Sequence, residues 1–213
     1  MDLDISDGAA RANHALLHRL LDERNRDPAR AEAIDAEIRR AFEQTVAILV
    51  LDMVGFSRTS LRLGIIHYLA MIRAMEAAAR PAVAAFGGRV IKQEADNLFA
   101  VFDTPTLAVR AALAIFEAFE ASNREVEADR HIQGGIGIGF GPVLVIDGRD
   151  LFGSEMNLAC KLGEDHAQGS EILLTAAACS ALEPDLGAIE PATFAVSGLR
   201  IDGHRLRYDR AAP

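Results

Sequence analysis

Two aspartates interrupt apolar segments that otherwise have the composition of buried strands. Asp52 closes a run of apolar residues that begins at Val46, and Asp96 lies between the apolar segments 90–91 and 98–102. A buried carboxylate without a partner costs free energy or shifts its pKa, so such a residue needs a cation or hydrogen-bond donors. Two of them in one half of a domain indicate a shared cation site.

The chemistry expected of this pair is the binding of two Mg²⁺ or Mn²⁺ ions. Hard divalent cations prefer carboxylate oxygens and complete their coordination with water and substrate phosphates. The turn Gly55-Phe56-Ser57 follows Asp52 and opens a helix, so its backbone N–H groups are placed to bind a polyphosphate. Each aspartate taken alone is better explained as a turn cap or a hairpin polar residue, but the pair together with this turn favours metal binding.

The elements that must position these residues alternate between strand-like and helix-like patterns. Strands are predicted at 46–52, 90–92, 98–102, 131–140, 143–146 and 171–175, and helices from about 57 to 85, from Thr104, over 153–166 and over 176–182. Hairpin turns are predicted at 94–97 and at Gly141-Pro142. The order β-α-β-β-α-β with additions predicts an α+β fold of the ferredoxin-like type, which places Asp52 close to Asp96.

Several segments have a predicted environment. The helix over 57–85 is expected to bury a stripe of apolar residues: Ile65, Ile66, Leu69, Ile72, Met75 and Ala79. The run 134–141 alternates glycine with apolar residues, which predicts close strand packing, because a dinucleotide-binding loop would need a helix directly after it. Asn157 and Lys161 are four residues apart and therefore share one face of the helix over 153–166.

Residues 1–44 are predicted to form an N-terminal helical extension ahead of a main domain at 45–213. Leucines within 16–21 and the stripe Ile34, Ile38 and Phe42 have helical spacing, and Asp27-Pro28 is typical of a helix start. Two interpretations are open: the helices pack on their own domain, or they form an arm for dimerisation or for a regulatory partner.

Composition narrows the range of partners. The 213 residues carry a formal net charge of −9, which argues against nucleic acid or an anionic membrane surface as a partner. The N-terminus lacks the apolar core of a secretory signal, and no apolar run approaches the ~20 residues of a membrane helix. Cys160 and Cys179 have no metal-site spacing, and Cys160 is expected to be a buried core thiol. We therefore expect a cytoplasmic protein.

Five stretches, in this order, resemble the catalytic domain of the class III nucleotidyl cyclases, the family of adenylate and guanylate cyclases. They are Leu51-Asp-Met-Val-Gly-Phe-Ser57, Gly88-Arg-Val-Ile-Lys-Gln-Glu-Ala-Asp96, Ile136-Gly-Ile-Gly-Phe-Gly-Pro142, Phe152-Gly153 with Asn157, and Gly169-Ser-Glu-Ile-Leu-Leu-Thr175. The resemblance covers about residues 45–208. It implies conversion of ATP to cyclic AMP and pyrophosphate by a homodimer whose active sites lie between the subunits.

The resemblance also implies a role for each candidate residue. Asp52 and Asp96 match the ligands of the two metal ions. Lys92 and Asp150 match the residues that read adenine. The chemistry suits this role, since Asp can accept from the N6 amino group and Lys can donate to N1. Asn157 matches the residue that orients the ribose, and Lys161 stands where the family usually has a transition-state arginine.

Lys161 keeps the charge of that arginine but lacks its planar fork. Ala95 stands where glycine usually precedes the second metal ligand, at a turn where positive φ would strain alanine. The family's C-terminal triphosphate lysine is missing from the stretch 196–200, where Arg200 is the candidate substitute. Two alternatives therefore stay open: a cyclase for GTP or a pyrimidine triphosphate, and a degenerate homologue that binds nucleotide and regulates without turnover.

Overall fold

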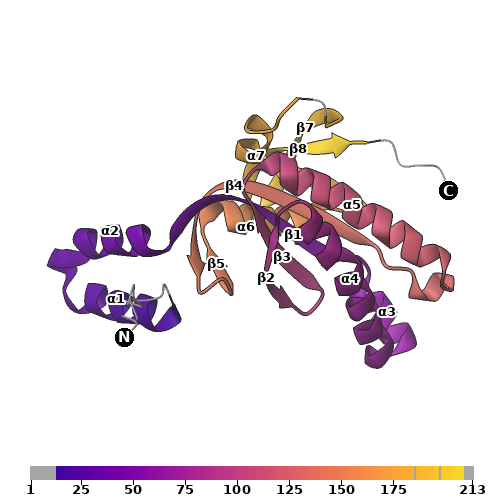
Figure 1. Cartoon of the computed structure of the whole chain (residues 1–213), viewed down its shortest axis with the longest axis horizontal. Helices are drawn as coiled ribbons and strands as arrows, with labels where there is room; N and C mark the ends of the chain where they lie inside the picture. The colour runs from indigo at the N-terminus through magenta and orange to yellow at the C-terminus, as the bar shows by residue number, and fades with distance from the viewer. Residues whose placement is uncertain (1–12, 185, 197, 209–213) are drawn as a thin grey trace, which may run out of the picture.

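The computed structural model describes residues 13–184, 186–196 and 198–208; the side chains of residues 56–58, 196 and 199 are outside this description. Its strands form one sheet in the order β2-β3-β1-β4-β6-β8-β7, with β5 paired to β4 (Figure 1). The strands are β1 (Glu43–Met53), β2 (Arg89–Glu94), β3 (Asn97–Phe102), β4 (Gly134–Ile146), β5 (Asp150–Phe152), β6 (Ile172–Thr175), β7 (Ala188–Val196) and β8 (Leu199–Arg207).

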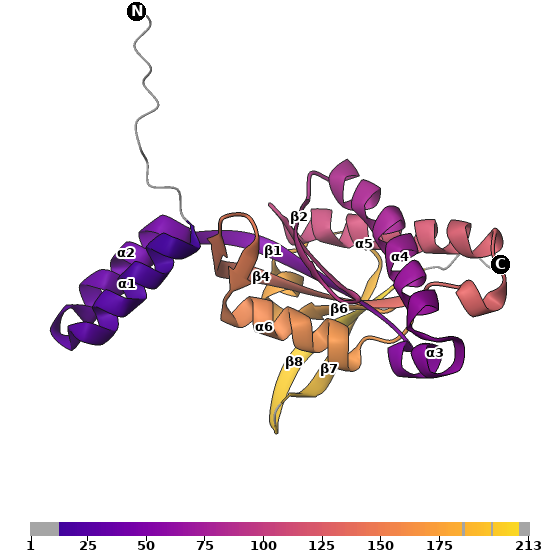
Figure 2. The same ribbon diagram turned by 90° about the horizontal axis from the view of Figure 1, so that it is seen from below.

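Helices cover both faces of this sheet. They are α1 (His14–Arg26), α2 (Ala31–Phe42), α3 (Phe56–Leu63), α4 (Ile65–Ala85), α5 (Pro105–Arg124), α6 (Ser154–Cys160) and α7 (Ala176–Ser180), with 3-10 turns at Pro28–Arg30 and Ala128–Arg130 and a π-helical segment at Lys161–His166. Figure 2 shows α4 and α5 on one side of the sheet and α6 on the other. The α+β architecture predicted from the sequence is confirmed.

β1 is an inner strand between β3 and β4, and it is buried on both faces from Val46 to Leu51. Leu49 and Leu51 pack into the core beneath α4 and α5, whereas Ile48 and Val50 pack toward α6. Successive side chains of a strand point to opposite faces, so a strand covered on both sides needs an unbroken apolar run. This burial explains the apolar sequence that ends at Asp52.

The glycines of β4 permit a close approach of α6. A Cβ atom on Gly137 would lie 2.1 Å from the carbonyl oxygen of Ala159, and one on Gly139 would lie 2.7 Å from that of Glu155. Such contacts would force the helix backbone away from the strand. The glycine-rich run is thus a strand under close packing, as predicted.

The turn predicted at Gly141-Pro142 is wrong. β4 continues through these residues, with Pro142 opposite Thr45 and Leu144 opposite Glu43 of β1. Pairing along the whole length of β1 outweighs the local turn preference. The chain turns instead at Asp147 and Gly148, both with positive φ, before β5 begins. The Asp-Gly pair is a turn signal in its own right.

The single helix predicted over 57–85 is also wrong. Gly64, with φ of 86°, separates α3 from α4. The buried face of α4 is formed by Tyr68, Met71, Ile72, Met75, Ala79, Ala82 and Val83. Three residues assigned to the apolar stripe are exposed: Ile65 (54%), Ile66 (81%) and Leu69 (52%). The whole stripe lies within α4, but the helix is turned so that the face of Tyr68, Met75 and Ala79 meets the core; Ile66 and Leu69 lie off that face, and Ile65 is in the exposed first turn.

The described part of the N-terminal extension forms a helical hairpin of α1 and α2 to one side of the sheet (Figure 2). Leu17, Leu20, Ile34, Ile38 and Phe42 are buried in a small core that also contains Ile146 of β4. α2 ends at Phe42 and β1 begins at Glu43, so the two parts are joined without a linker. The hairpin packs against the end of β4 and is continuous with the central strand.

The hairpin of β2 and β3 contains the backbone strain expected at Ala95, whose φ is 51°. We predict that Ala95→Gly stabilises the protein by about 0.5–1 kcal/mol, because glycine adopts this conformation without the steric cost of a Cβ atom. The midpoint of urea unfolding should rise. Ala77→Gly, an exposed site within α4, is the control and should cost about 1 kcal/mol. A lower midpoint for Ala95→Gly would contradict the strain.

Candidate active site

Asp52 and Asp96 come together at one end of the sheet. β1 and β3 are antiparallel neighbours with Asp52 opposite Asn97, and Asp96 directly precedes Asn97. Both aspartates line a cavity of about 740 Å³, which also includes Gly55, Gln133 and the segment 164–169. The proximity that the ferredoxin-like order predicted is therefore present.

The electrostatics of this cavity disfavour its own negative charge. The pKa of Asp52 is raised to about 7, first by burial and then by the charges of Asp96, Glu164 and Asp165. The pKa of Glu164 is also raised, mainly by burial. A divalent cation would relieve this repulsion, so the donor set fits a hard metal ion.

The number of protein ligands fits metals that are shared with a substrate. Within the described ranges, no group of three or more His, Cys, Asp and Glu side chains is arranged to hold a metal ion. Two aspartates therefore leave most of the coordination to water and phosphate oxygens, as is usual for Mg²⁺. Asn97 adds an unpaired acceptor beside the site: its Oδ1 is buried without a hydrogen-bond partner, while its Nδ2 donates to Glu164 Oε1 at 3.1 Å.

Tyr68 is a site residue that sequence reasoning missed. Its hydroxyl donates to Asp96 Oδ2 at 2.7 Å, and the side chain is 1% exposed. Burial, followed by the contact with Asp96, raises the pKa of this phenol, which therefore stays protonated as a donor. One oxygen of Asp96 is thereby oriented from α4. The only sequence signal was a tyrosine among the apolar residues of the helix.

The π-helical segment Lys161–His166 brings acidic residues to the same cavity. Gly163 lies against β1, where a Cβ atom would be 2.8 Å from the carbonyl oxygen of Val50. This approach places Glu164 and Asp165 on the cavity wall. Lys161 forms an ion pair with Asp165 at 2.9 Å. Cys160, just before the segment, is half-buried against the core that contains Met156 and Ala159, whereas the sequence predicted a buried core thiol; burial raises the pKa of its thiol to about 12.

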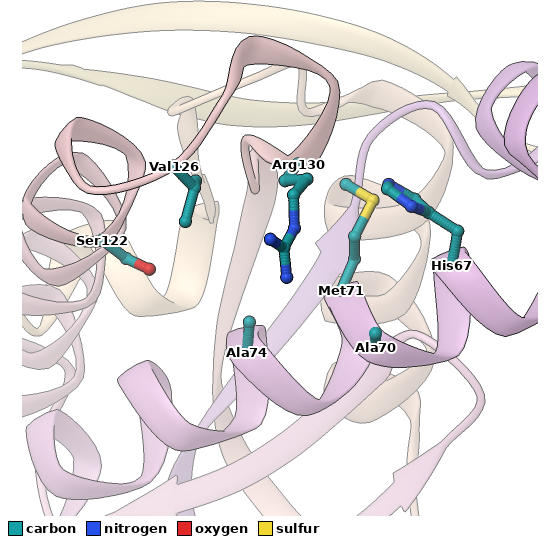
Figure 3. Close-up of a pocket in the computed structure, with 7 residues that line it drawn as sticks. All are labelled: His67, Ala70, Met71, Ala74, Ser122, Val126 and Arg130. Atoms are coloured by element: carbon teal, nitrogen blue, oxygen red, sulfur yellow. The ribbon is translucent and has the colours of Figure 1, made fainter.

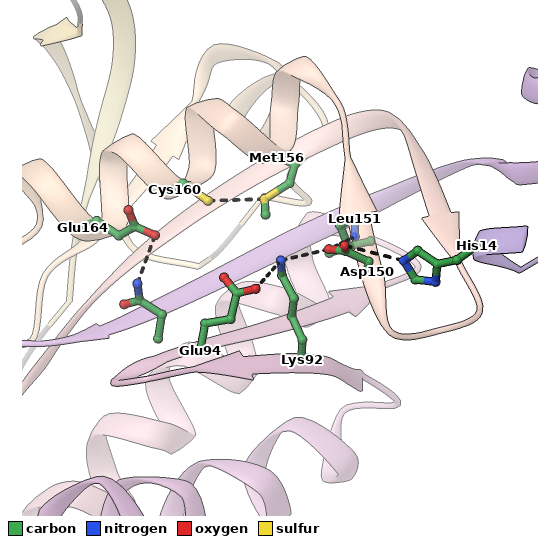
Figure 4. Close-up of polar contacts among 9 residues, drawn as sticks. His14, Lys92, Glu94, Asp150, Leu151, Met156, Cys160 and Glu164 are labelled. Atoms are coloured by element: carbon green, nitrogen blue, oxygen red, sulfur yellow. Dashed lines mark hydrogen bonds and ion pairs between the residues drawn. The ribbon is translucent and has the colours of Figure 1, made fainter. Parts of the chain in front are cut away.

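Lys92 and Asp150 form a second cluster (Figure 4). Lys92 Nζ lies 2.8 Å from Asp150 Oδ1 and 2.9 Å from Glu94 Oε1, and it is 5.1 Å from the centre of the Phe99 ring. Burial is the largest single influence on the pKa of Asp150 and raises it, but the hydrogen bonds from Lys92 and from the backbone N–H of Leu151, together with the nearby positive charge, outweigh burial and leave the pKa lowered. Lys92 and Asp150, which the resemblance grouped although they are 58 positions apart, are thus in contact as a charged pair.

The remaining candidates have simpler surroundings. Asn157 is exposed on α6, one turn before Lys161. Gly55 has φ of 98° and precedes the first residue of α3, so its turn is in the place expected for phosphate binding. Phe56 and Ser57 belong to the first turn of α3, but their side chains lie outside the described part of the chain. Arg200 is exposed on β8.

Another cavity, of about 310 Å³, lies between α4 and the end of α5 (Figure 3). Its lining is mostly apolar and consists of His67, Ala70, Met71, Ala74, Ser122, Val126 and Arg130. None of the predicted site residues lines it. The cavity with the two aspartates is therefore the candidate active site.

No helix among the described residues is long and apolar enough to cross a membrane.

Two curated proteins are similar in sequence. A Rhizobium meliloti (strain 1021) protein named provisionally as adenylate cyclase 3 is 37% identical over 117 residues, which are 54% of this chain and 20% of the relative. A Streptomyces coelicolor (strain A3(2)) protein named adenylate cyclase is 30% identical over 120 residues, which are 56% of this chain and 30% of the relative. The chain thus matches less than a third of the length of either relative. No protein-family model matches the sequence.

Solved structures share the fold. An adenylate/guanylate cyclase/hydrolase from Silicibacter pomeroyi has a TM-score of 0.65 and 26% identity, covering 78% of this chain and 98% of that one. Other neighbours include adenylyl and guanylyl cyclase domains at 18–20% identity, which share the fold. These matches confirm the resemblance to class III nucleotidyl cyclases that the five sequence stretches predicted.

The raised pKa of Asp52 predicts a pH dependence of stability in metal-free protein. The pKa is about 7 in the folded state against an ordinary value of 3.8, so folding favours the protonated carboxyl. This contribution is fully present below about pH 4 and is lost as the pH rises through about 7. In EDTA at pH 8, Asp52→Asn should therefore be more stable than wild type by about 1 kcal/mol, after allowance for solvent screening.

The measurement is urea unfolding at pH 5 and pH 8. The difference between Asp52→Asn and wild type should be smaller at pH 5, and millimolar Mn²⁺ should reduce it at pH 8. Asp103→Asn, an exposed site directly after β3, is the control and should show neither change. Equal stability of Asp52→Asn and wild type at pH 8 would contradict the repulsion around Asp52.

Proposed function

We propose that this chain, which has the catalytic fold of the class III nucleotidyl cyclases, converts ATP to 3′,5′-cyclic AMP and pyrophosphate as a homodimer. The observation that carries the proposal is the pair of Asp52 and Asp96 in a cavity whose charges repel one another. The names of the sequence relatives support a cyclase and favour ATP. The neighbouring structures include both adenylate and guanylate cyclases and so do not distinguish ATP from GTP. The choice of base therefore rests on Lys92 and Asp150.

Asp52 and Asp96 would hold two Mg²⁺ or Mn²⁺ ions together with phosphate oxygens and water. When bound, such ions act as Lewis acids for the ribose 3′-hydroxyl and for the leaving pyrophosphate. Tyr68 fixes one oxygen of Asp96 and keeps the carboxylate aimed at the cavity. The backbone N–H groups at Gly55 and the first turn of α3 would bind the triphosphate. These residues act through positioning and electrostatics, and none is a nucleophile.

Lys92 and Asp150 would read the base. Asp150 accepts from the amino group of adenine, and Lys92 donates to the neighbouring ring nitrogen. Guanine presents a carbonyl oxygen and a protonated nitrogen at these positions, so the same pair disfavours it. The alternative of GTP as substrate is thus weaker on chemical grounds, whereas a pyrimidine triphosphate is decided by the assay with all four nucleotides.

The homodimer would bring together residues from both subunits. One subunit would supply the metal-binding aspartates, and the other would supply the base-reading pair of Lys92 and Asp150 as well as Asn157 and Lys161. Asn157 would orient the ribose and Lys161 would stabilise charge on the reacting phosphate. Among the described residues, no hydrogen bond or ion pair links Asp52 or Asp96 to Lys92 or Asp150, which is compatible with sites shared between two chains. The N-terminal helices would set the dimer or bind a regulatory partner. ATP as substrate and two free cysteines suit a cytoplasmic location.

The test is a turnover assay with the four nucleoside triphosphates and Mg²⁺ or Mn²⁺. We expect cyclic AMP from ATP, and we expect Asp52→Ala to lower the rate at least about a hundredfold, because it removes a metal ligand. Asp103→Ala, which changes an exposed carboxylate outside the cavity, is the control and should retain activity.

Each other result has a defined meaning. A cyclic product from a different nucleotide would overturn the assignment of the base and retain the cyclase. Nucleotide binding without any product would favour the regulatory homologue that Lys161 and Ala95 suggest. Full activity of Asp52→Ala would overturn the metal site itself.

Lys161 gives a further prediction. We expect Lys161→Arg to raise kcat by about three- to tenfold, because a guanidinium can contact two phosphate oxygens where an ammonium contacts one. Lys161→Ala should lower kcat by about tenfold or more. The KM for ATP should change less than kcat in both variants. An unchanged kcat in Lys161→Ala would remove this residue from the reaction.

A further inference from the structure

The N-terminal extension reaches the cluster of Lys92 and Asp150. His14, the first residue of α1, has its Nε2 3.8 Å from Asp150 Oδ2, as Figure 4 shows. The two residues are 136 positions apart, and His14 belongs to the helical hairpin rather than to the sheet. A side chain outside the main domain thus borders the carboxylate to which we assign base recognition.

The two oxygens of Asp150 have different surroundings. Oδ1 accepts from Lys92 Nζ at 2.8 Å and from the backbone N–H of Leu151 at 2.9 Å. Oδ2 faces His14 at a distance too long for a hydrogen bond, so the imidazole acts on it as a nearby charge when protonated. Oδ2 therefore remains able to accept a hydrogen bond from a ligand while its direction is biased by His14.

The position of His14 is fixed by the structure around it. The side chain of Asn13 accepts from the N–H of Leu16 and caps α1 at its first turn. Leu17 and Leu20 then anchor α1 in the core that contains Ile146. Ile146 pairs with Asp150 in the hairpin of β4 and β5. The helix that carries His14 and the strand that carries Asp150 are thus held by one apolar core.

We propose that His14 is a positioning residue for base recognition, through which the N-terminal extension takes part in the choice of nucleotide. It orients Asp150 Oδ2 toward the exocyclic amino group of a purine. The inference rests on the proposed function, because it assumes that Asp150 meets the base. It adds that residues 14–42 carry a determinant of specificity as well as a structural role.

The test compares three variants at His14 and His18. His14→Ala should raise the KM for ATP about two- to fivefold, the range expected for a half-exposed ion pair, with little change in kcat. The preference for ATP over GTP should fall by a similar factor. His14→Lys, which places a permanent positive charge at this position, should restore both values. His18→Ala changes the exposed histidine one turn along α1, whose ring is 6.2 Å from that of His14, and should match wild type.

A cycle with Asp150 separates positioning from a general effect on the fold. If His14 acts through Asp150, then His14→Ala should change neither KM nor the ATP preference in an Asp150→Asn background. An equal effect in both backgrounds, an effect of His18→Ala as large as that of His14→Ala, or an unchanged KM in His14→Ala would each overturn the proposal.

A measurement without nucleotide keeps this proposal distinct from the proposed function. The imidazole resonances of His14 in the NMR spectrum should shift in Asp150→Asn, whereas those of His18 should not. Absence of this shift overturns the role of His14 whether or not the protein is active. The shift together with no cyclic product from any nucleotide overturns the proposed cyclase and, with it, a role for His14 in selecting a substrate.

Discussion

The burial of β1 on both faces is the constraint on which the rest of the structure depends. Leu49 and Leu51 need the layer of α4 and α5, and Ile48 and Val50 need the layer of α6. A strand held in this way cannot shift its register without moving apolar side chains to the wrong face. Asp52 follows directly on this rigid stretch, so its carboxylate is delivered to a fixed point at the edge of the core. Close packing at Gly137 and Gly163 keeps the second layer near enough for Glu164 to reach the same point.

Sequence patterns could predict the features that depend on local chemistry. The apolar run before Asp52 and the turn before Asn97 follow from residue types in short windows, whereas the strain at Ala95 was predicted from the family resemblance, in which glycine usually stands at this position. The turn at Gly141-Pro142 was wrong because β1 pairs with β4 along its whole length, a long-range preference that no local window contains. Tyr68 escaped attention for a similar reason: its partner Asp96 lies 28 positions away, and only the packing of α4 on the sheet joins them.

The two polar clusters differ in how their charge is balanced. Lys92 and Asp150 neutralise one another, and the lowered pKa of Asp150 shows that the pair is stable as ions. Among the described residues, no cationic side chain pairs with Asp52 or Asp96, and burial together with the neighbouring acidic charges raises the pKa of Asp52. A ligand that brings positive ions and phosphates would suit Asp52 and Asp96. A neutral ring with polar edges would suit Lys92 and Asp150. A metal-bound nucleoside triphosphate has both kinds of group in one molecule.

The end of β4 joins this chemistry to the N-terminal helices. Ile146 lies in the core of α1 and α2, and the next residues form the turn that leads to Asp150. A movement of the helical hairpin would therefore act on this turn first, because Leu144 and Ile146 are shared between the two parts. Asp52 and Asp96 lie on strand ends held by the large core and would be less affected. The architecture thus allows the extension to act on Asp150, to which we assign base recognition, while the proposed metal ligands Asp52 and Asp96 stay in place. Under the proposed function, a partner bound to these helices would change the affinity for nucleotide more than the rate of the reaction.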